Sequence, residues 1–237
     1  IFFVNIIVFI VMFLQLSRLF SYEKNLIFKL FSPYNLNNIR FILSKTKHIG
    51  GDQVITSLNK YGYIFIIGLL MSPTQVSYFT IVQRFSLTMA FFFIIINSFS
   101  LPIYSKLISK KDKISLVELF YKNMRFCLYG VVSFCITILL ARNVISDIYS
   151  IPNNIFINLF LLLALGEIFH GTVGLCVPIL QISERSKLVI SSNLIFSFLG
   201  IVSSLFFSNQ NLLIYALCVS FSVAAHNILC FIKFKQL

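Results

Sequence analysis

Residues 77–104, SYFTIVQRFSLTMAFFFIIINSFSLPIY, form an apolar run that is long enough to cross the hydrocarbon core of a bilayer as a helix. Arg84 is the only charged residue in this run, and apolar and polar positions do not alternate strictly. Only helices and closed β-barrels satisfy all their backbone hydrogen bonds in lipid, and the strands of a barrel alternate in polarity. The run therefore predicts a membrane-spanning helix.

The whole chain has the composition of an integral membrane protein. Of its 237 residues, 58% are apolar and 11% are charged, whereas a soluble domain has about 25% charged residues. This composition excludes disordered, collagen-like and disulfide-rich secreted proteins. Further apolar runs lie at about residues 1–16, 52–70, 121–141, 155–181, 188–207 and 211–232. The sequence thus predicts an all-α integral membrane protein with about seven transmembrane helices.

The basic residues are concentrated in every second connection between the runs. These connections hold 16 of the 19 Lys and Arg residues, whereas the alternate connections hold only Arg142. The basic connections are residues 17–50, 105–125, 182–187 and 233–237. Because cytoplasmic loops carry an excess of Lys and Arg, we expect these connections and the C-terminus to be cytoplasmic. The net charge of +12 is then a topology signal, and we expect no nucleic-acid partner.

The first 50 residues are expected to form a truncated span followed by helical pieces at the cytoplasmic interface. Residues 26–47 mix apolar and basic side chains, a pattern typical of helices that lie among lipid headgroups. The chain starts inside an apolar run, without Met and without the charged region and cleavage site of a signal peptide. We therefore expect a piece of a longer protein.

Prolines and glycines mark expected bends in two spans. Pro102 lies near the end of the third span, and Pro178 lies within the fifth, after Gly171 and Gly174. Because Pro lacks a backbone donor and clashes with the preceding turn, we expect kinks at both prolines.

Two basic residues, Lys60 and Arg84, lie inside predicted spans. Each is about ten residues from the nearer end of its span, so at 1.5 Å per residue both lie about 12–15 Å deep. A cation at that depth costs several kcal/mol unless it faces water or a partner. Both residues are therefore candidates for a functional role.

Other polar residues share a helix face with these two cations. The set in the second span is Asp52, Thr56, Asn59, Lys60 and Tyr63. The set in the third span is Thr80, Arg84 and Thr88. We interpret the two faces as the lining of a water-filled cavity. The alternatives are helix-joining ion pairs, Lys60–Asp52 or Arg84–Glu167, and a Lys60 side chain that reaches the interface.

Glu167 and His170 lie one helical turn apart near the middle of the fifth span. Both can change charge near neutral pH when buried, so the pair is a candidate for ion or proton coupling. Hydrogen bonding between helices is the alternative.

Motifs of soluble enzyme chemistry are absent from the sequence. There is no glycine-rich phosphate loop, GxSxG, HExxH or paired-carboxylate motif. The five cysteines lie in apolar runs without a CxxC pair, which argues against a metal site or a disulfide framework. We therefore predict no catalytic residue, no metal and no cofactor.

Three stretches together resemble the Wzx-type O-antigen and polysaccharide flippases of the multidrug/oligosaccharidyl-lipid/polysaccharide (MOP) exporter superfamily. They are LNKYGYIFIIGLLMSPTQVSYFTIVQRFS (58–86), SLPIYSKLISKKDKISLVELFYKNMRF (100–126) and LQISERSK (180–187). The family's P-x-x-S-K helix end is matched by Pro102, Ser105 and Lys106. Relatives often have an acidic residue shortly before the IIG run, where this chain has Tyr63.

The resemblance implies a twelve-helix transporter with two six-helix lobes around a cationic cavity. Residues 1–50 would form the last helix of the first lobe and an interfacial linker, and residues 51–237 the second lobe. Such a protein moves undecaprenyl-pyrophosphate-linked repeat units across the bacterial inner membrane by alternating access. Its partners would be the lipid-linked oligosaccharide, membrane lipids and other polysaccharide-assembly proteins. The cavity residues that would bind substrate are Lys60, Arg84, Asn59, Tyr63, Thr56 and Thr80.

Two other functions stay open. One is a membrane-embedded polymerase or acyltransferase of polysaccharide assembly, although the outer connections are short and contain Asp147 as their one acidic residue. The other is a multidrug exporter of the same superfamily. A cavity for cationic drugs would favour acidic residues, whereas the deep charges here are mainly basic, with Glu167 as the exception.

Overall fold

The computed structural model describes residues 36–183, 185–207 and 211–236, and these residues are helical without a strand. The chain divides into two compact units, Ile1–Lys47 and His48–Leu237. Of the first unit, residues 36–47 are described, and they are helical. The elements are α3 (Leu36–Leu70), α4 (Pro73–Thr88), α5 (Ala90–Ser109), α6 (Lys113–Leu140), α7 (Arg142–Tyr149), α8 (Asn153–Gly171), the short 3₁₀ helix Val173–Leu175, α9 (Cys176–Ile182), α10 (Ser186–Phe207) and α11 (Leu212–Phe234).

Five helical stretches among the described residues are long and apolar enough to cross a membrane, which confirms a multi-pass, all-α membrane protein. They are Pro73–Ser109, Lys113–Leu140, Asn153–Ile182, Ser186–Phe206 and Leu212–Phe234. The run at 52–70 is helical within α3 but is not one of the five, because polar residues such as Asp52 and Lys60 lower its hydropathy. The run at 1–16 lies outside the described residues, so the count of seven stays a prediction.

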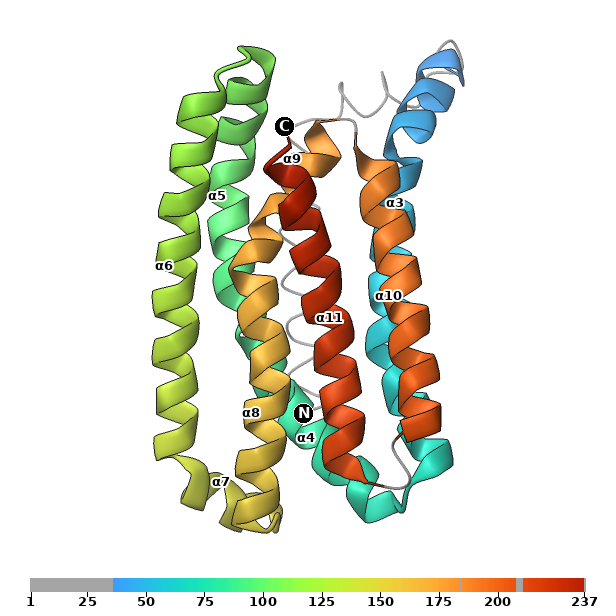
Figure 1. The fold of residues 1–237 in the computed structure, drawn as a ribbon, viewed down its shortest axis with the longest axis vertical. Coiled ribbons are helices and arrows are strands. Elements are labelled where there is room, and N and C mark those ends of the chain that lie inside the picture. The colour runs from blue at the N-terminus through green and yellow to red at the C-terminus, as the bar shows by residue number, and fades with distance from the viewer. Residues whose placement is uncertain (1–35, 184, 208–210, 237) are drawn as a thin grey trace, which may run out of the picture. The chain divides into compact units, whose positions relative to one another are not determined.

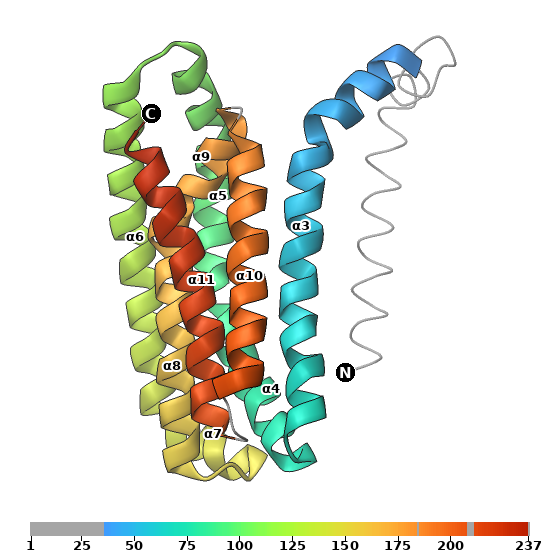
Figure 2. The ribbon, with the colours of Figure 1, turned by 45° about the vertical axis from the view of Figure 1, so that its right-hand side comes forward.

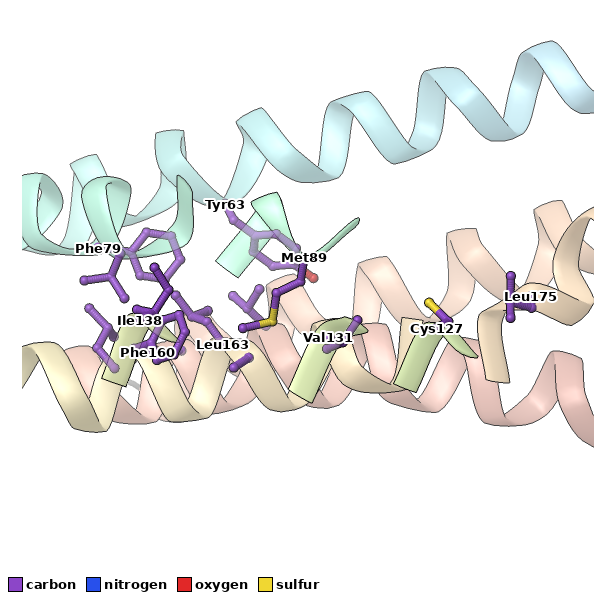
Figure 3. Packing of buried hydrophobic residues seen from close by; sticks show 14 of the residues in the cluster. Tyr63, Phe79, Met89, Cys127, Val131, Ile138, Phe160, Leu163 and Leu175 are labelled. Atoms are coloured by element: carbon purple, nitrogen blue, oxygen red, sulfur yellow. The ribbon is translucent and has the colours of Figure 1, made fainter. Parts of the chain in front are cut away.

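Helix α11 packs along α8 and α10, and α4, α5 and α6 also contact α8 (Figures 1 and 2). Figure 3 shows buried side chains at these contacts, among them Phe79, Val131 and Phe160. At the contact of α8 with α11, a Cβ built on Gly166 would lie 3.1 Å from the Ser220 Cα. The Ser220 hydroxyl donates a hydrogen bond to a carbonyl of α8. Small residues and polar cross-links of this kind are typical of helix contacts in membranes.

Large apolar side chains cover the outside of the second unit. Phe99 and Phe206 are each more than 70% exposed, and Leu140 is 82% exposed. A water-soluble monomer rarely exposes apolar surface on this scale, whereas the acyl chains of a bilayer cover it at no cost.

The bend in the fifth span is confirmed. Helix α8 ends at Gly171, the 3₁₀ helix follows, and α9 contains Pro178. Gly174 lies in this break because a Cβ there would be only 2.6 Å from the Asn227 Oδ1 of α11.

The third span has an interruption that no proline or glycine predicted, at Met89 between α4 and α5. Helix α5 continues through Pro102 to Ser109, so the expected kink at Pro102 stays a prediction. The hydroxyls of Ser86 and Thr88 donate to carbonyls of the preceding turn, at 2.9 Å each.

Candidate functional site

The polar face of α3 lies against α10. The Asn193 Nδ2 donates to the Thr56 Oγ1 at 3.2 Å. The Asn59 Nδ2 donates to the Asn193 Oδ1 at 3.3 Å and also to the Ser197 Oγ. These contacts join the α3 residues to Asn193 and Ser197, which lie one turn apart on α10.

Asp52 lies at the start of this face and is 5% exposed. Its two carboxylate oxygens accept hydrogen bonds from the Asn193 Nδ2 at 2.7 Å and from the Gln181 Nε2 at 3.0 Å. Among the described side chains, the hydrogen-bond donors to Asp52 are these neutral amides, which orient the carboxylate without neutralising it. Because burying a charge is costly, this arrangement favours binding of a proton or a small cation at Asp52.

Tyr63, at the other end of the same face, is buried between α10 and α11. Its hydroxyl donates to the Ser222 Oγ at 3.2 Å, and its carbonyl accepts a bond from the Tyr215 hydroxyl. Ser222 in turn donates to a carbonyl of α10 at 2.6 Å. We call the whole set the polar seam: Asp52, Thr56, Asn59 and Tyr63 with Gln181, Asn193, Ser197 and Ser222.

Gly200 allows the helices of the seam to approach at Tyr63. A Cβ built on Gly200 would lie 2.6 Å from the Ser222 Cβ and would collide with the Tyr63 hydroxyl. We expect Gly200→Ala to lower stability by about 1–3 kcal/mol, as overpacking does. Thermal unfolding of the purified protein measures this. Gly68→Ala is the matched control, since its Cβ would meet nothing within 4 Å, and equal unfolding temperatures for the two variants would contradict the seam packing.

Arg84 lies on the exposed side of α4, within the span Pro73–Ser109. The hydroxyls of Thr80 and Thr88, on the same side, donate to carbonyls of α4 itself at 2.8 and 2.9 Å. The opposite side of the helix is buried against the bundle through Phe79 and Val82. The cation therefore points away from the helices of its own unit.

Glu167 and His170 lie near the C-terminal end of α8, beside the break, and both are partly buried. The His170 ring packs on Phe93 of α5 with ring centroids 4.6 Å apart. The His170 Nδ1 would lie 3.3 Å from a Cβ on Gly174. His170 thus faces α5 and the bend.

The predicted site residues do not gather in one place. Thr56, Asn59 and Tyr63 belong to the polar seam, whereas Arg84 is exposed on α4 and Thr80 is partly buried one turn before it. The side chain of Lys60 lies outside the described residues. The seam partners Gln181, Asn193, Ser197 and Ser222 were not predicted, although they recur as isolated polar residues within apolar runs. Among the described residues, no group of three or more His, Cys, Asp and Glu residues is arranged to hold a metal ion.

Comparison of the chain with family models, with curated proteins and with solved structures gives no match in any of the three. The function is therefore argued from the residues and their contacts.

Proposed function

We propose that the chain is the C-terminal part of a bacterial inner-membrane transporter that moves undecaprenyl-pyrophosphate-linked polysaccharide repeat units by alternating access. In this proposal residues 51–237 form the second six-helix lobe and residues 1–50 the preceding helix and linker. The single observation that carries the proposal is the exposed Arg84 on a membrane-spanning helix.

An exposed guanidinium at this depth would be strongly unfavourable against acyl chains. The face of α4 that carries Arg84 is thus better suited to an aqueous cavity or to a bound anion. A diphosphate is an anion suited to Arg84, because the planar guanidinium can donate two parallel hydrogen bonds to phosphate oxygens. The lipid tail of such a substrate would stay in the bilayer while the sugars cross the cavity.

The polar seam offers a site for coupling transport to an ion. Binding of a proton or a monovalent cation at Asp52 would remove its buried charge without disturbing the neutral amides of Gln181 and Asn193. Asp52 therefore joins Glu167 and His170 as a candidate for ion or proton coupling.

Deleting the gene tests the proposal and separates it from its alternatives. Loss of the transporter should remove surface polysaccharide and leave single lipid-linked repeat units on the cytoplasmic side, and the native gene should restore export. If single repeat units still reach the cell surface but are not polymerised or acylated, the chain belongs to an enzyme of assembly. If surface polysaccharide is unchanged and sensitivity to cationic drugs rises, it belongs to a drug exporter.

The proposal includes a defined orientation in the membrane. The α5–α6 turn and α7 lie at opposite ends of the bundle (Figure 1). Because the basic residues gather at the α5–α6 end, a reporter inserted after Lys111 should be cytoplasmic and one inserted after Ser150 periplasmic. Activity of a periplasm-specific and a cytoplasm-specific reporter at each position measures this, and the reverse pattern would overturn the orientation.

A further inference from the structure

The turn between α5 and α6 forms the tip of a hairpin whose two helices extend past the neighbouring ends of α9 and α11 (Figures 1 and 2). Below this tip, Phe120 of α6 packs on Phe231 and Phe234 of α11. We call residues 105–125 the basic hairpin. It contains six basic and two acidic residues. All six basic side chains are exposed: Lys106, Lys110, Lys111, Lys113, Lys122 and Arg125.

The turn of the basic hairpin is held by hydrogen bonds. The backbone N–H groups of Lys111 and Asp112 donate to carbonyls of the last turn of α5, at 3.0 Å each. Asp112 caps α6 by accepting from the Ser115 N–H at 3.1 Å and from the Ser115 hydroxyl at 2.7 Å. These bonds lower the pKa of Asp112, so the cap stays ionised at neutral pH. These hydrogen bonds thus define the backbone conformation of the turn that carries the lysines.

Exposed apolar side chains lie beside these cations. Ile114 is 84% exposed and Val117 is 40% exposed, and together with Lys113 and Glu118 they line a shallow hollow. Helix α6 has 28 residues and is about 42 Å long, whereas the hydrocarbon core is about 30 Å thick. The charged residues of α6 lie in its first half and residues 126–140 carry none, so the excess length is expected at the start of the helix, among the lipid headgroups. Cations next to exposed apolar groups at this level are typical of a surface that binds a membrane interface.

We propose that the basic hairpin binds the headgroups of anionic phospholipids, with Lys106, Lys110 and Lys111 contacting phosphates and Ile114 packing among the headgroups beside them. The positive charges of the lysines complement the negative headgroups, and both helices that carry the hairpin are membrane spans. The phosphates of the surrounding leaflet are therefore the anions at highest local concentration. An acidic protein is the competing partner, and the experiment below separates the two.

The test uses the purified full-length protein in nanodiscs of phosphatidylcholine, alone or mixed with phosphatidylglycerol. Phosphatidylglycerol that remains bound is counted by native mass spectrometry, and its affinity is titrated at low and high salt. Each Lys near an anionic surface strengthens binding about fivefold, so Lys106→Gln, Lys110→Gln and Lys111→Gln together should weaken it about 100-fold. High salt should weaken binding to the native protein, since exposed charges are screened.

Two control variants keep the result interpretable. The three lysines changed to Arg preserve the charge and should preserve the affinity, and Arg142→Gln, at the opposite end of the bundle, should leave it unchanged. Ile114→Ser removes the apolar contact without a charge change and should weaken binding less than the triple Gln variant.

Unchanged phosphatidylglycerol binding by the triple Gln variant, or binding insensitive to salt, would overturn the proposal. Loss of a co-purifying acidic protein with unchanged lipid binding would assign the hairpin to that partner instead. None of these outcomes depends on which substrate the protein transports.

Discussion

Replacing Arg84 by Glu is expected to abolish export of lipid-linked repeat units while leaving the amount of protein in the membrane unchanged. The exposed guanidinium does not hold the bundle together, since the packed side of α4 is formed by residues such as Phe79 and Val82. Arg84→Ala removes one charge-assisted contact, worth about 1.5–3 kcal/mol, and should slow export about 10- to 100-fold. Arg84→Glu also repels the diphosphate, so we expect it to reduce export more than Arg84→Ala does.

The readouts are surface polysaccharide in cells lacking the native gene and immunoblotting of membranes. Arg84→Lys keeps the charge but loses the bidentate geometry, so we expect partial export. Arg142→Glu is the matched control, because this exposed Arg lies on α7 at the end of the bundle and should tolerate reversal. Normal export by Arg84→Glu would refute the substrate contact. Loss of the protein from the membrane would instead indicate a structural role.

Features that depend on local sequence were predictable. Five of the apolar runs are long and apolar enough to form a span by themselves, so their helices follow from length and composition. The bend after α8 follows from Gly171, Gly174 and Pro178, since glycine and proline act on the backbone at their own positions. The same reasoning did not predict the interruption of the third span at Met89, where neither glycine nor proline lies, while α5 continues through Pro102.

The polar seam was only half predictable. Helical spacing placed Asp52, Thr56, Asn59 and Tyr63 on one face, and that face is polar in the structure. Helical periodicity does not predict which helix packs against such a face, because the partner residues lie more than 100 positions away along the chain. Asn193 and Gln181 are single polar residues in apolar runs, and only the packing of α9 and α10 brings them to Asp52. The seam therefore has the polarity expected of a cavity lining but serves as a contact between helices.

Asn193 is the residue on which the seam depends most, and Asn193→Leu is expected to lower stability by about 2–4 kcal/mol. Its side chain donates to Asp52 and Thr56 and accepts from Asn59 and Ser197, so Leu of similar size removes all four bonds. Hydrogen bonds between neutral groups in membrane bundles are worth only about 0.6 kcal/mol on average. The larger loss is expected because a buried carboxylate would keep a single donor, from Gln181.

Asn123→Leu supplies the matched control. The Asn123 Nδ2 donates to the hydroxyls of Ser100 and Tyr104 at 2.7 Å each, so this variant also breaks contacts between helices, but with neutral partners. Unfolding of the purified protein by detergent or heat compares the two. Adding Asp52→Asn to Asn193→Leu should recover part of the lost stability, because it removes the buried carboxylate charge that Asn193 no longer stabilises. Asp52→Asn alone should destabilise the native seam. If the two Leu variants lose equal stability and the double variant is simply additive, Asp52 carries no buried charge in the folded protein. The seam would then be a neutral helix contact at the pH of the measurement.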